Sequence, residues 1–264
     1  MDYNPLIITA FASKINEDDI TLNDDINLYA INAAYKINDK SGIQVYLVEK
    51  TDSNGAKTDT VITPGVLYTA SPMDNLALSA EIAMQKGNCQ DGATTNKRSA
   101  WAMQAMANYL FKDKNMAPSL GLGYTYLSGD KTDDNKDKAW DPMFEDQAPN
   151  NITNALFGQS NAQVINVQGG IKPRDDVSIV AKYGNYRLAQ KKYDNLTTLF
   201  NLSPGYVMTG KKDLGNALDL TATYDYTEDV QLGLTWGMFK PGKAFVKADR
   251  EMASQLIGSM KVTF

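Results

Sequence analysis

Residues 218–238 read LDLTATYDYTEDVQLGLTWGM, and this stretch decides the fold. In both halves an apolar or aromatic side chain alternates with a polar or small one. Alternation with a period of two is typical of a β-strand that has one apolar face. The polar segment at residues 227–229 separates the two runs and is typical of a tight turn. The stretch therefore predicts an antiparallel hairpin with one apolar and one polar face.

The same alternation recurs along most of the chain and predicts an all-β protein with about twelve strands of roughly ten residues, the length that crosses a bilayer at a tilt. No segment shows a helical period. Pro64 weakens one predicted strand, because proline cannot donate a ladder hydrogen bond. The predicted strands cover residues 6–13, 26–37, 42–50, 61–70, 76–84, 101–109, 119–126, 165–171, 177–184, 218–226, 230–238 and a last strand that ends at Phe264.

The connections alternate between short and long, which is typical of an outer-membrane barrel with short periplasmic turns and longer external loops. We therefore predict a transmembrane antiparallel up-and-down β-barrel, formed by residues 1–264 as a single domain, with both termini on the periplasmic side. The predicted short turns are 39–41, 72–75, 112–115, 173–176 and 227–229. The predicted long loops are 16–25, 51–59, 87–97, 129–160, 190–213 and 241–253.

Composition excludes several other classes of protein. None of the 264 residues is a histidine, which removes a histidine-based triad and the common zinc sites. A net charge of −5 argues against a nucleic-acid partner. No apolar run reaches the roughly 18 residues that a spanning helix needs. The single cysteine, Cys89, has no partner for an internal disulfide. A soluble sandwich or lipocalin-like barrel would also alternate, but it does not explain the regular loop pattern.

Aromatic residues near the strand ends predict the girdles that anchor a barrel at the two lipid interfaces. These girdle candidates are Trp101, Tyr109, Tyr124, Tyr126, Tyr183, Tyr224, Tyr226 and Trp236. Phe264 ends the last alternating strand. A terminal aromatic residue resembles the signal by which the barrel assembly machinery recognises outer-membrane proteins, so we expect that machinery to be a partner.

If the apolar face meets lipid, the polar face lines the lumen. The side chains predicted to line the pore carry hydroxyl, amide and both kinds of charged group, as passage of a hydrophilic solute requires. They are Lys36, Glu81, Gln104, Asn108, Gln168, Lys172, Lys182, Asp219, Asp225, Gln231 and Lys261. The alternative is that these side chains only solvate a plugged interior or pair with one another across it.

The loop at residues 129–160 is too long for a simple connection. Its apolar centre, Trp140, Asp141, Pro142 and Phe144, needs burial and predicts a constriction folded into the lumen or packed on the barrel rim. The oxygen-rich start of the loop offers weak calcium candidates, against which a solvated loop is the plainer interpretation. These candidates are Asp130, Asp133, Asp134 and Asp137, and no other cofactor is expected.

One part of the chain resembles a known family. Residues 121–130 read GLGYTYLSGD, residues 140–144 read WDPMF, and Phe157-Gly158 follow. This pattern is similar to that of the alginate-export porins, which pair a glycine–tyrosine strand ending in Ser-Gly-Asp with an aromatic–Asp–Pro–Leu–Phe stretch. The resemblance implies an outer-membrane porin. Because barrels of that family exceed twelve strands, the chain is either a self-contained smaller barrel or the C-terminal part of a larger one.

These observations favour a channel that passes a hydrophilic solute, anionic or saccharide-like, across the bacterial outer membrane. The alternative is a structural sleeve that houses a partner protein such as a periplasmic electron carrier. An enzyme is not expected, because no nucleophile–base or metal motif is present.

Overall fold

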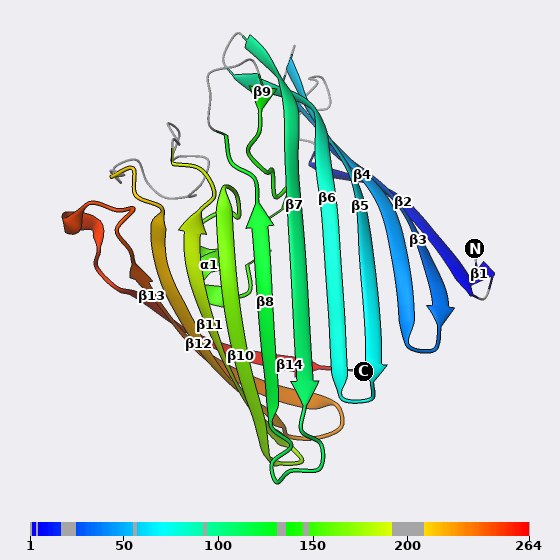
Figure 1. The fold of residues 1–264 in the computed structure, drawn as a ribbon, viewed down its shortest axis with the longest axis vertical. Coiled ribbons are helices and arrows are strands. Elements are labelled where there is room, and N and C mark those ends of the chain that lie inside the picture. Colours follow the sequence, from blue (N-terminus) through cyan, green and yellow to red (C-terminus); the bar gives the residue numbers. More distant parts are fainter. Residues whose placement is uncertain are drawn as a thin grey trace.

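The computed structural model describes residues 2–3, 5–16, 25–54, 57–91, 94–130, 136–144, 148–191 and 209–263. It is an all-β structure built on one sheet, in which thirteen strands pair antiparallel in sequence order (Figure 1). The first half contains β1 (Asp2–Tyr3), β2 (Leu6–Asn16), β3 (Ile26–Asn38), β4 (Ser41–Asn54), β5 (Lys57–Met73), β6 (Leu76–Asp91) and β7 (Thr94–Leu110). The second half contains β8 (Ser119–Leu127), β10 (Ala162–Arg174), β11 (Val177–Leu188), β12 (Asp213–Asp225), β13 (Val230–Pro241) and β14 (Ala253–Val262).

Three small elements complete the description. The two-residue strand β9 (Lys136–Asp137) pairs in parallel with β7, α1 (Asn151–Leu156) is a short helix, and Lys247–Asp249 form one 3₁₀ turn. The twelve long strands are those that the alternation predicts. The helix was not predicted, because six residues are too few to show a helical period. Within the described residues, no helix is long and apolar enough to cross a membrane.

Most of the long strands exceed the roughly ten residues predicted, and this corrects two of the loops. Residues 51–59 and 87–97 were predicted as long loops, but β4 and β5 pair from Asn54↔Lys57, and β6 and β7 pair from Asp91↔Thr94. The backbone groups of polar residues form ladder hydrogen bonds as well as those of apolar residues, so these hairpins continue past the alternating segments. The end of the alternation therefore does not mark the end of these strands.

Pro64 lies inside β5 and does not end it. Its neighbour on β4 is Leu47, while the ladder on the β6 side is interrupted between Ile62↔Lys86 and Gly65↔Ala83. The missing donor of proline accounts for the interruption on one side. The strand continues because its partner on the other side is unaffected.

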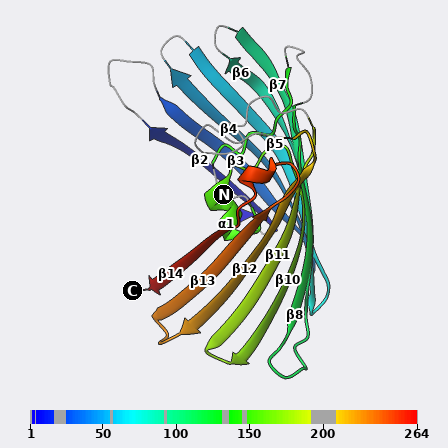
Figure 2. The same ribbon diagram turned by 90° about the vertical axis from the view of Figure 1, so that its left-hand side faces the viewer.

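The antiparallel sheet has the strand order of the predicted up-and-down β-barrel, but it is not closed. It bends into a trough in which β2 and β14 border the opening (Figure 2). Among the described residues, β1 and β14 end the strand order and do not pair with each other. Closure requires a backbone ladder between the first and last strands, and alternation within a strand carries no information about that ladder. Leu256 and Met260 of β14 are consequently 68% and 69% exposed.

Both described chain ends lie at the edge of the sheet with the short turns. The Lys36 amide donates to the Pro5 carbonyl at 2.9 Å, and the Thr263 amide donates to the Asp229 carbonyl at 2.9 Å. Residues 39–40 and 227–229 form the short turns beside these bonds. The strands thus run between a short-turn edge and a long-loop edge, as Figure 1 shows.

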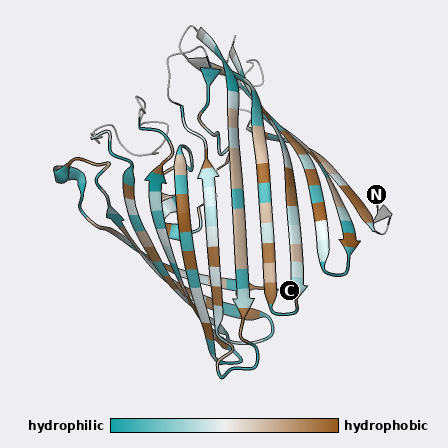
Figure 3. Cartoon of the chain, viewed as in Figure 1, coloured by the Kyte–Doolittle hydropathy of each residue, from teal (hydrophilic) through white to brown (hydrophobic). Residues whose placement is uncertain are grey.

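The two faces of the sheet differ in chemistry, and the apolar bands alternate with polar ones along each strand (Figure 3). The convex outer face exposes large apolar side chains, of which Ile82, Leu122 and Leu234 are examples. The concave inner face is polar at most positions. Its buried apolar cluster forms where Trp140, Ile152 and Phe157 of the long loop pack on it, together with Ala244 and Phe245 of the segment after β13. Apolar side chains therefore face outward over most of the sheet, as in a protein that meets lipid.

Candidate functional site: the inner face and its strap

The predicted pore-lining residues share the inner face. Residues directly opposite each other in a ladder point to the same side, and one row of opposite residues runs Asn108, Gly121, Gln168, Lys182, Asp219. Asp219 accepts the Asn151 amide at the start of α1, and α1 lies on the concave side of the sheet (Figure 2). The remaining candidates join the same face through their own ladders or through the two-residue repeat, and they are Lys36, Glu81, Gln104, Lys172, Asp225, Gln231 and Lys261.

Hydrogen bonds tie up most of the acidic and amide groups on this face. Tyr46 Oη donates to Glu81 Oε1, and Gln231 Nε2 donates to Asp225 Oδ1 at 2.7 Å. Gln168 Nε2 donates to Asn108 Oδ1 at 2.6 Å. The basic groups differ, because Lys172, Lys182 and Lys261 form no ion pair within the described part of the chain. The three lysines therefore remain available to contact a solute, while the hydrogen-bonded carboxylates keep their negative charge.

The described parts of the long loop, residues 136–144 and 148–157, lie on the inner face, and we call them the strap. The outer end of the strap is fixed to β6 and β7. Gln85 is fully buried and bonds the Asp141 backbone twice, accepting from its amide at 2.8 Å and donating to its carbonyl at 2.7 Å. Arg98 is 6% exposed and pairs with Asp137 at 3.1 Å and Asp141 at 3.4 Å. This anchor holds Trp140, which is 8% exposed, against the wall.

The second part of the strap is fixed to the opposite wall, formed by β11, β12 and β13. Asp219 is 2% exposed, and its Oδ2 accepts the Asn151 amide at 2.6 Å, at the start of α1. Tyr186 Oη donates to Asn150 Oδ1 at 3.0 Å and lies 2.9 Å from Thr153 Oγ1. Asn150 Nδ2 in turn donates to the Lys182 carbonyl at 2.9 Å. The strap is therefore bonded to both walls of the trough.

Two glycines make room for this part of the strap. A Cβ placed on Gly184 would lie 2.4 Å from Asn150 Oδ1, and one on Gly237 would lie 3.1 Å from Ile152 Cβ. Both distances are shorter than ordinary contacts. Phe157 then packs edge-on against Tyr186 and Phe239, with ring centroids 5.9 Å and 5.5 Å apart. The sheet thus carries a recess shaped for the strap.

The four predicted constriction residues occupy different places. Trp140 is buried in the cluster, and Asp141 takes part in the outer anchor. Pro142 is half-buried, whereas Phe144 is exposed. The Lys50 Nζ atom lies over the face of the Phe144 ring, 5.4 Å from the ring centroid. Lys50 also donates to the Met143 carbonyl at 3.2 Å. The aromatic centre of the loop is thus on the inner face and not on the rim.

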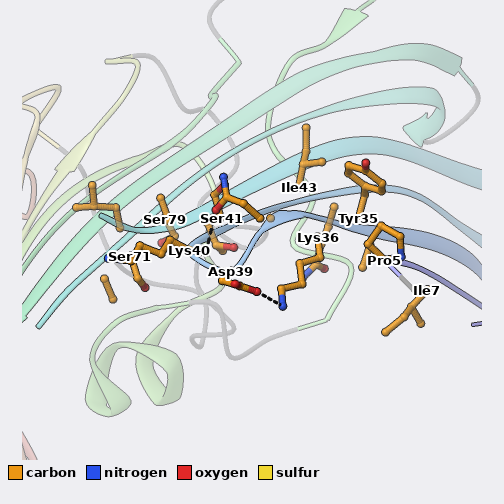
Figure 4. Close-up of a pocket in the computed structure, with 18 of the residues that line it drawn as sticks. Pro5, Ile7, Tyr35, Lys36, Asp39, Lys40, Ser41, Ile43, Ser71 and Ser79 are labelled. Carbon is orange, nitrogen blue, oxygen red and sulfur yellow. Dashed lines mark hydrogen bonds and ion pairs between the residues drawn. The ribbon is translucent and has the colours of Figure 1, made fainter. Parts of the chain in front are cut away.

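One cavity lies beside the short turns, and another lies beside the strap. One of about 530 Å³ lies at the short-turn edge, where Lys36 Nζ pairs with Asp39 Oδ1 at 2.7 Å (Figure 4). This lysine lowers the pKa of the Asp39 carboxyl, mainly through their hydrogen bond. The other cavity, of about 340 Å³, lies beside Trp140 and is lined by Tyr46, Glu81 and Gln104 among others.

The structure describes two of the four calcium candidates, Asp130 and Asp137. Asp137 is paired with Arg98, and Asp133 and Asp134 lie outside the described residues. Among the residues that are described, no group of three carboxylates or thiols is placed to hold a metal ion. Asp130 has a partner of its own.

The girdle candidates all belong to the outer face. The Trp101 and Tyr126 rings stack at 4.5 Å, and the Tyr109 ring packs on Phe111 at 4.7 Å. Three further outward aromatics, Tyr29, Tyr35 and Tyr68, are exposed and were not predicted as girdle residues. The remaining candidates lie on the apolar faces of their strands, and they are Tyr124, Tyr183, Tyr224, Tyr226 and Trp236. Phe264 lies outside the described residues.

Sequence reasoning also missed the residues that hold the strap. Gln85, Arg98 and Tyr186 bond to a segment far away in sequence, and no local pattern marks that pairing. Gly184 and Gly237 were visible as glycines within strands, which often mark a close approach of another chain segment. Arg187, near the end of β11, is exposed on the outer face, whereas its neighbour Tyr186 is buried on the inner face.

The comparisons with known proteins agree with this architecture. Among solved structures, Pseudomonas aeruginosa OccK11 (OpdR) matches with a TM-score of 0.57 at 10% identity, over 100% of this chain and 68% of that one. A structure described as the CymD monoaromatic hydrocarbon channel matches with a TM-score of 0.41 at 11% identity, over 98% of this chain and 78% of that one. Both neighbours are outer-membrane β-barrels, and the first supports the same fold here.

A search of the curated proteins finds no match. The family comparison does find one, as the resemblance in residues 121–158 predicts. The model of the family described as alginate export matches residues 13–259, which is most of the chain. The chain therefore belongs to the alginate export family.

Proposed function

We propose that this protein is a channel in the bacterial outer membrane that lets a small hydrophilic solute pass, with its termini on the periplasmic side. The strap is the observation that carries the proposal. At one end it is bonded to β6 and β7, and at the other it is bonded to β11 and β12 and packs on β13. A segment fixed across a polar inner face narrows the path without sealing it, as a selectivity constriction must. The family and the barrel fold support the same conclusion.

The inner face supports an anionic or saccharide-like solute. Its acids are held by hydrogen bonds with Tyr46, Gln231 and the Asn151 amide, whereas Lys172, Lys182 and Lys261 form no ion pair in the described part. Hydroxyl and amide groups between them suit a solute that carries hydroxyl groups. We assign transport and no catalysis. The strap also occupies the space that a housed protein would need, so a sleeve is not favoured.

Conduction requires that the two sheet edges be paired in the membrane. An unpaired ladder in hydrocarbon leaves amide and carbonyl groups without partners, at several kcal/mol each. We propose that β14 and the β2 edge pair in the membrane, either with each other or with further strands. The outer-face aromatics would then lie at the headgroups, and Phe264 would serve recognition by the barrel assembly machinery.

Single-channel recording in a planar bilayer under a salt gradient tests the proposal. We expect discrete open steps and a reversal potential that shows anion preference. Lys182→Glu should reduce this preference, because it reverses a charge on the inner face. Lys240→Glu, on the outer side of β13, is the matched control and should leave it unchanged. A protein that inserts but never conducts would refute the channel.

A further inference from the structure

We infer that the cavity beside Trp140 is a binding subsite for one ring of a neutral, hydroxyl-rich solute. The inference deepens the proposed channel function and rests on it. The cavity, of about 340 Å³, lies on the inner face against the strap. Its walls combine an indole and small apolar groups with a carboxylate, an amide and a hydroxyl, from Trp140, Leu127, Ala102, Glu81, Gln104 and Thr125. Its size is at the lower end of ordinary ligand clefts, which suits a single ring.

The hydrogen bonds within the wall leave a defined set of groups for a ligand. Tyr46 donates its only proton to Glu81 Oε1, so the carboxylate keeps Oε2 as an acceptor. Gln104 Nε2 donates to Thr125 Oγ1 at 3.1 Å, which leaves the amide Oε1 as a second acceptor. The second Gln104 Nε2 proton and the Thr125 hydroxyl proton are then the remaining donors. Two acceptors and two donors match a ligand that carries several O–H groups.

The charge of Glu81 selects against an anionic ligand. Glu81 forms no ion pair within the described residues, so it opposes a ligand carboxylate. A neutral ligand escapes this repulsion. The apolar groups of the wall, among them Trp140 and Leu127, suit the C–H faces of a sugar ring.

The subsite also lies where a passing solute must go. Trp140 belongs to the strap and is held by the neighbouring Asp141, whose backbone is bonded by Gln85. Glu81, Gln104 and Thr125 are directly opposite one another on β6, β7 and β8. The wall is therefore formed by rigid strands, and only the indole comes from the loop.

Binding is measured with three probes that share one ring, D-glucose, D-glucuronate and D-glucosamine, in a detergent without a sugar headgroup. The chain has three tryptophans, and Trp101 and Trp236 lie on the outer face. In a Trp101→Phe, Trp236→Phe background, Trp140 is the only indole and reports the cavity through its fluorescence. We expect a saturable change with glucose, binding at least about fivefold weaker for glucuronate, and no tighter binding for glucosamine than for glucose.

Substitutions within the wall separate this subsite from general sugar effects. Glu81→Gln keeps the shape and should bring glucuronate within about twofold of glucose. Thr125→Val should weaken glucose about fivefold, the effect of one lost hydrogen bond. Thr223→Val, on the inner face away from the cavity, is the control and should change nothing. Glu81→Gln and Thr125→Val are both conservative, so we expect the protein to fold. The test therefore needs no substitution of Trp140.

The contradicting results are distinct. Absence of a saturable change with glucose would overturn the subsite, and equal binding of glucuronate that Glu81→Gln leaves unchanged would overturn the role of charge. Tighter binding of glucosamine would assign the cavity to cations instead. Because binding is measured in detergent, loss of sugar binding with intact single-channel steps refutes the subsite alone. Sugar binding without any conduction refutes the channel.

Discussion

Buried polar side chains hold the strap, and each of them bonds to a segment distant in sequence. Gln85 mimics a backbone neighbour for Asp141, and Asp219 accepts an amide at the start of α1. Removing one member of such a pair leaves the other buried without a partner, which costs about 1–3 kcal/mol and more where a charge is involved. Single substitutions at the anchors are therefore expected to change the strap more than the sheet.

Arg98→Met should loosen the outer anchor, because it leaves the Asp137 and Asp141 carboxylates unpaired. We expect a larger single-channel conductance with more frequent fluctuations. Arg187→Met is the matched control, since Arg187 is an exposed arginine near the end of β11. An unchanged conductance in Arg98→Met, with the protein folded, would show that the strap does not limit the path.

Gly237→Ala should displace α1 from its recess, because the new Cβ would lie 2.7 Å from Asp219 Oδ1 and 3.1 Å from Ile152 Cβ. The expected result is faster amide exchange at residues 151–156 together with an increased conductance. Gly258→Ala provides the comparison, since nothing lies within 4 Å of a Cβ at that glycine. Equal exchange rates in the two variants would contradict the recess.

At the scale of the elements, the outer and inner faces of each strand are assigned to different surroundings. Leu234 and Ala222 are opposite each other on the outer face, and Gly233 and Thr223 are the next pair on the inner face. Substitutions in these two adjacent pairs therefore place a side chain on the outer or the inner face at nearly the same depth in the membrane. A charged side chain distinguishes them, since water surrounds it on one face and hydrocarbon on the other.

Leu234→Arg should destabilise the folded protein in a bilayer by about 2–4 kcal/mol, the cost of arginine on the lipid face near the midplane. Thr223→Arg should be tolerated, because its side chain points to the inner face. Urea-induced unfolding from lipid vesicles measures both. A greater loss for Thr223→Arg than for Leu234→Arg would reverse the assignment of the faces.

At the scale of the whole molecule, the open edges are the feature that a membrane acts on most strongly. The outer edge of β14 has no ladder partner among the described residues, whereas β13 is paired on both sides. Hydrocarbon penalises every unpaired group, so the membrane drives the edge to find a partner.

Hydrogen exchange in lipid nanodiscs tests this expectation. We expect every amide of β14 to be as protected as those of β13, because a neighbour pairs with its free edge in the membrane. If alternate β14 amides exchange as fast as the amides of the 227–229 turn, the sheet is open in the bilayer as well. If β14 is protected, the mass of the particle distinguishes closure within one chain from pairing between two copies.

The sequence by itself determined the strands, the two faces and the family. Period-two alternation is a local property, so each strand and its apolar side could be predicted without knowledge of its neighbours. Residues such as Leu234 and Gln231 were assigned to their faces in this way, and the motif in residues 121–158 indicated the family that the comparison confirmed. The short turns, such as residues 227–229, are also marked by local sequence, so the edge of the sheet on which they lie could be predicted as well.

Only the tertiary structure decided where the strap lies, which residues hold it and whether the sheet closes. Arg98 and Asp141 are 43 residues apart, and Asn151 and Asp219 are 68 residues apart, so no local pattern could pair them. The lengths of the hairpins after Asn54 and Asp91 depended on polar ladders that carry no periodic signal. Closure depends on two strands at opposite ends of the chain. These features arise from contacts between distant segments, which a pattern within one segment does not encode.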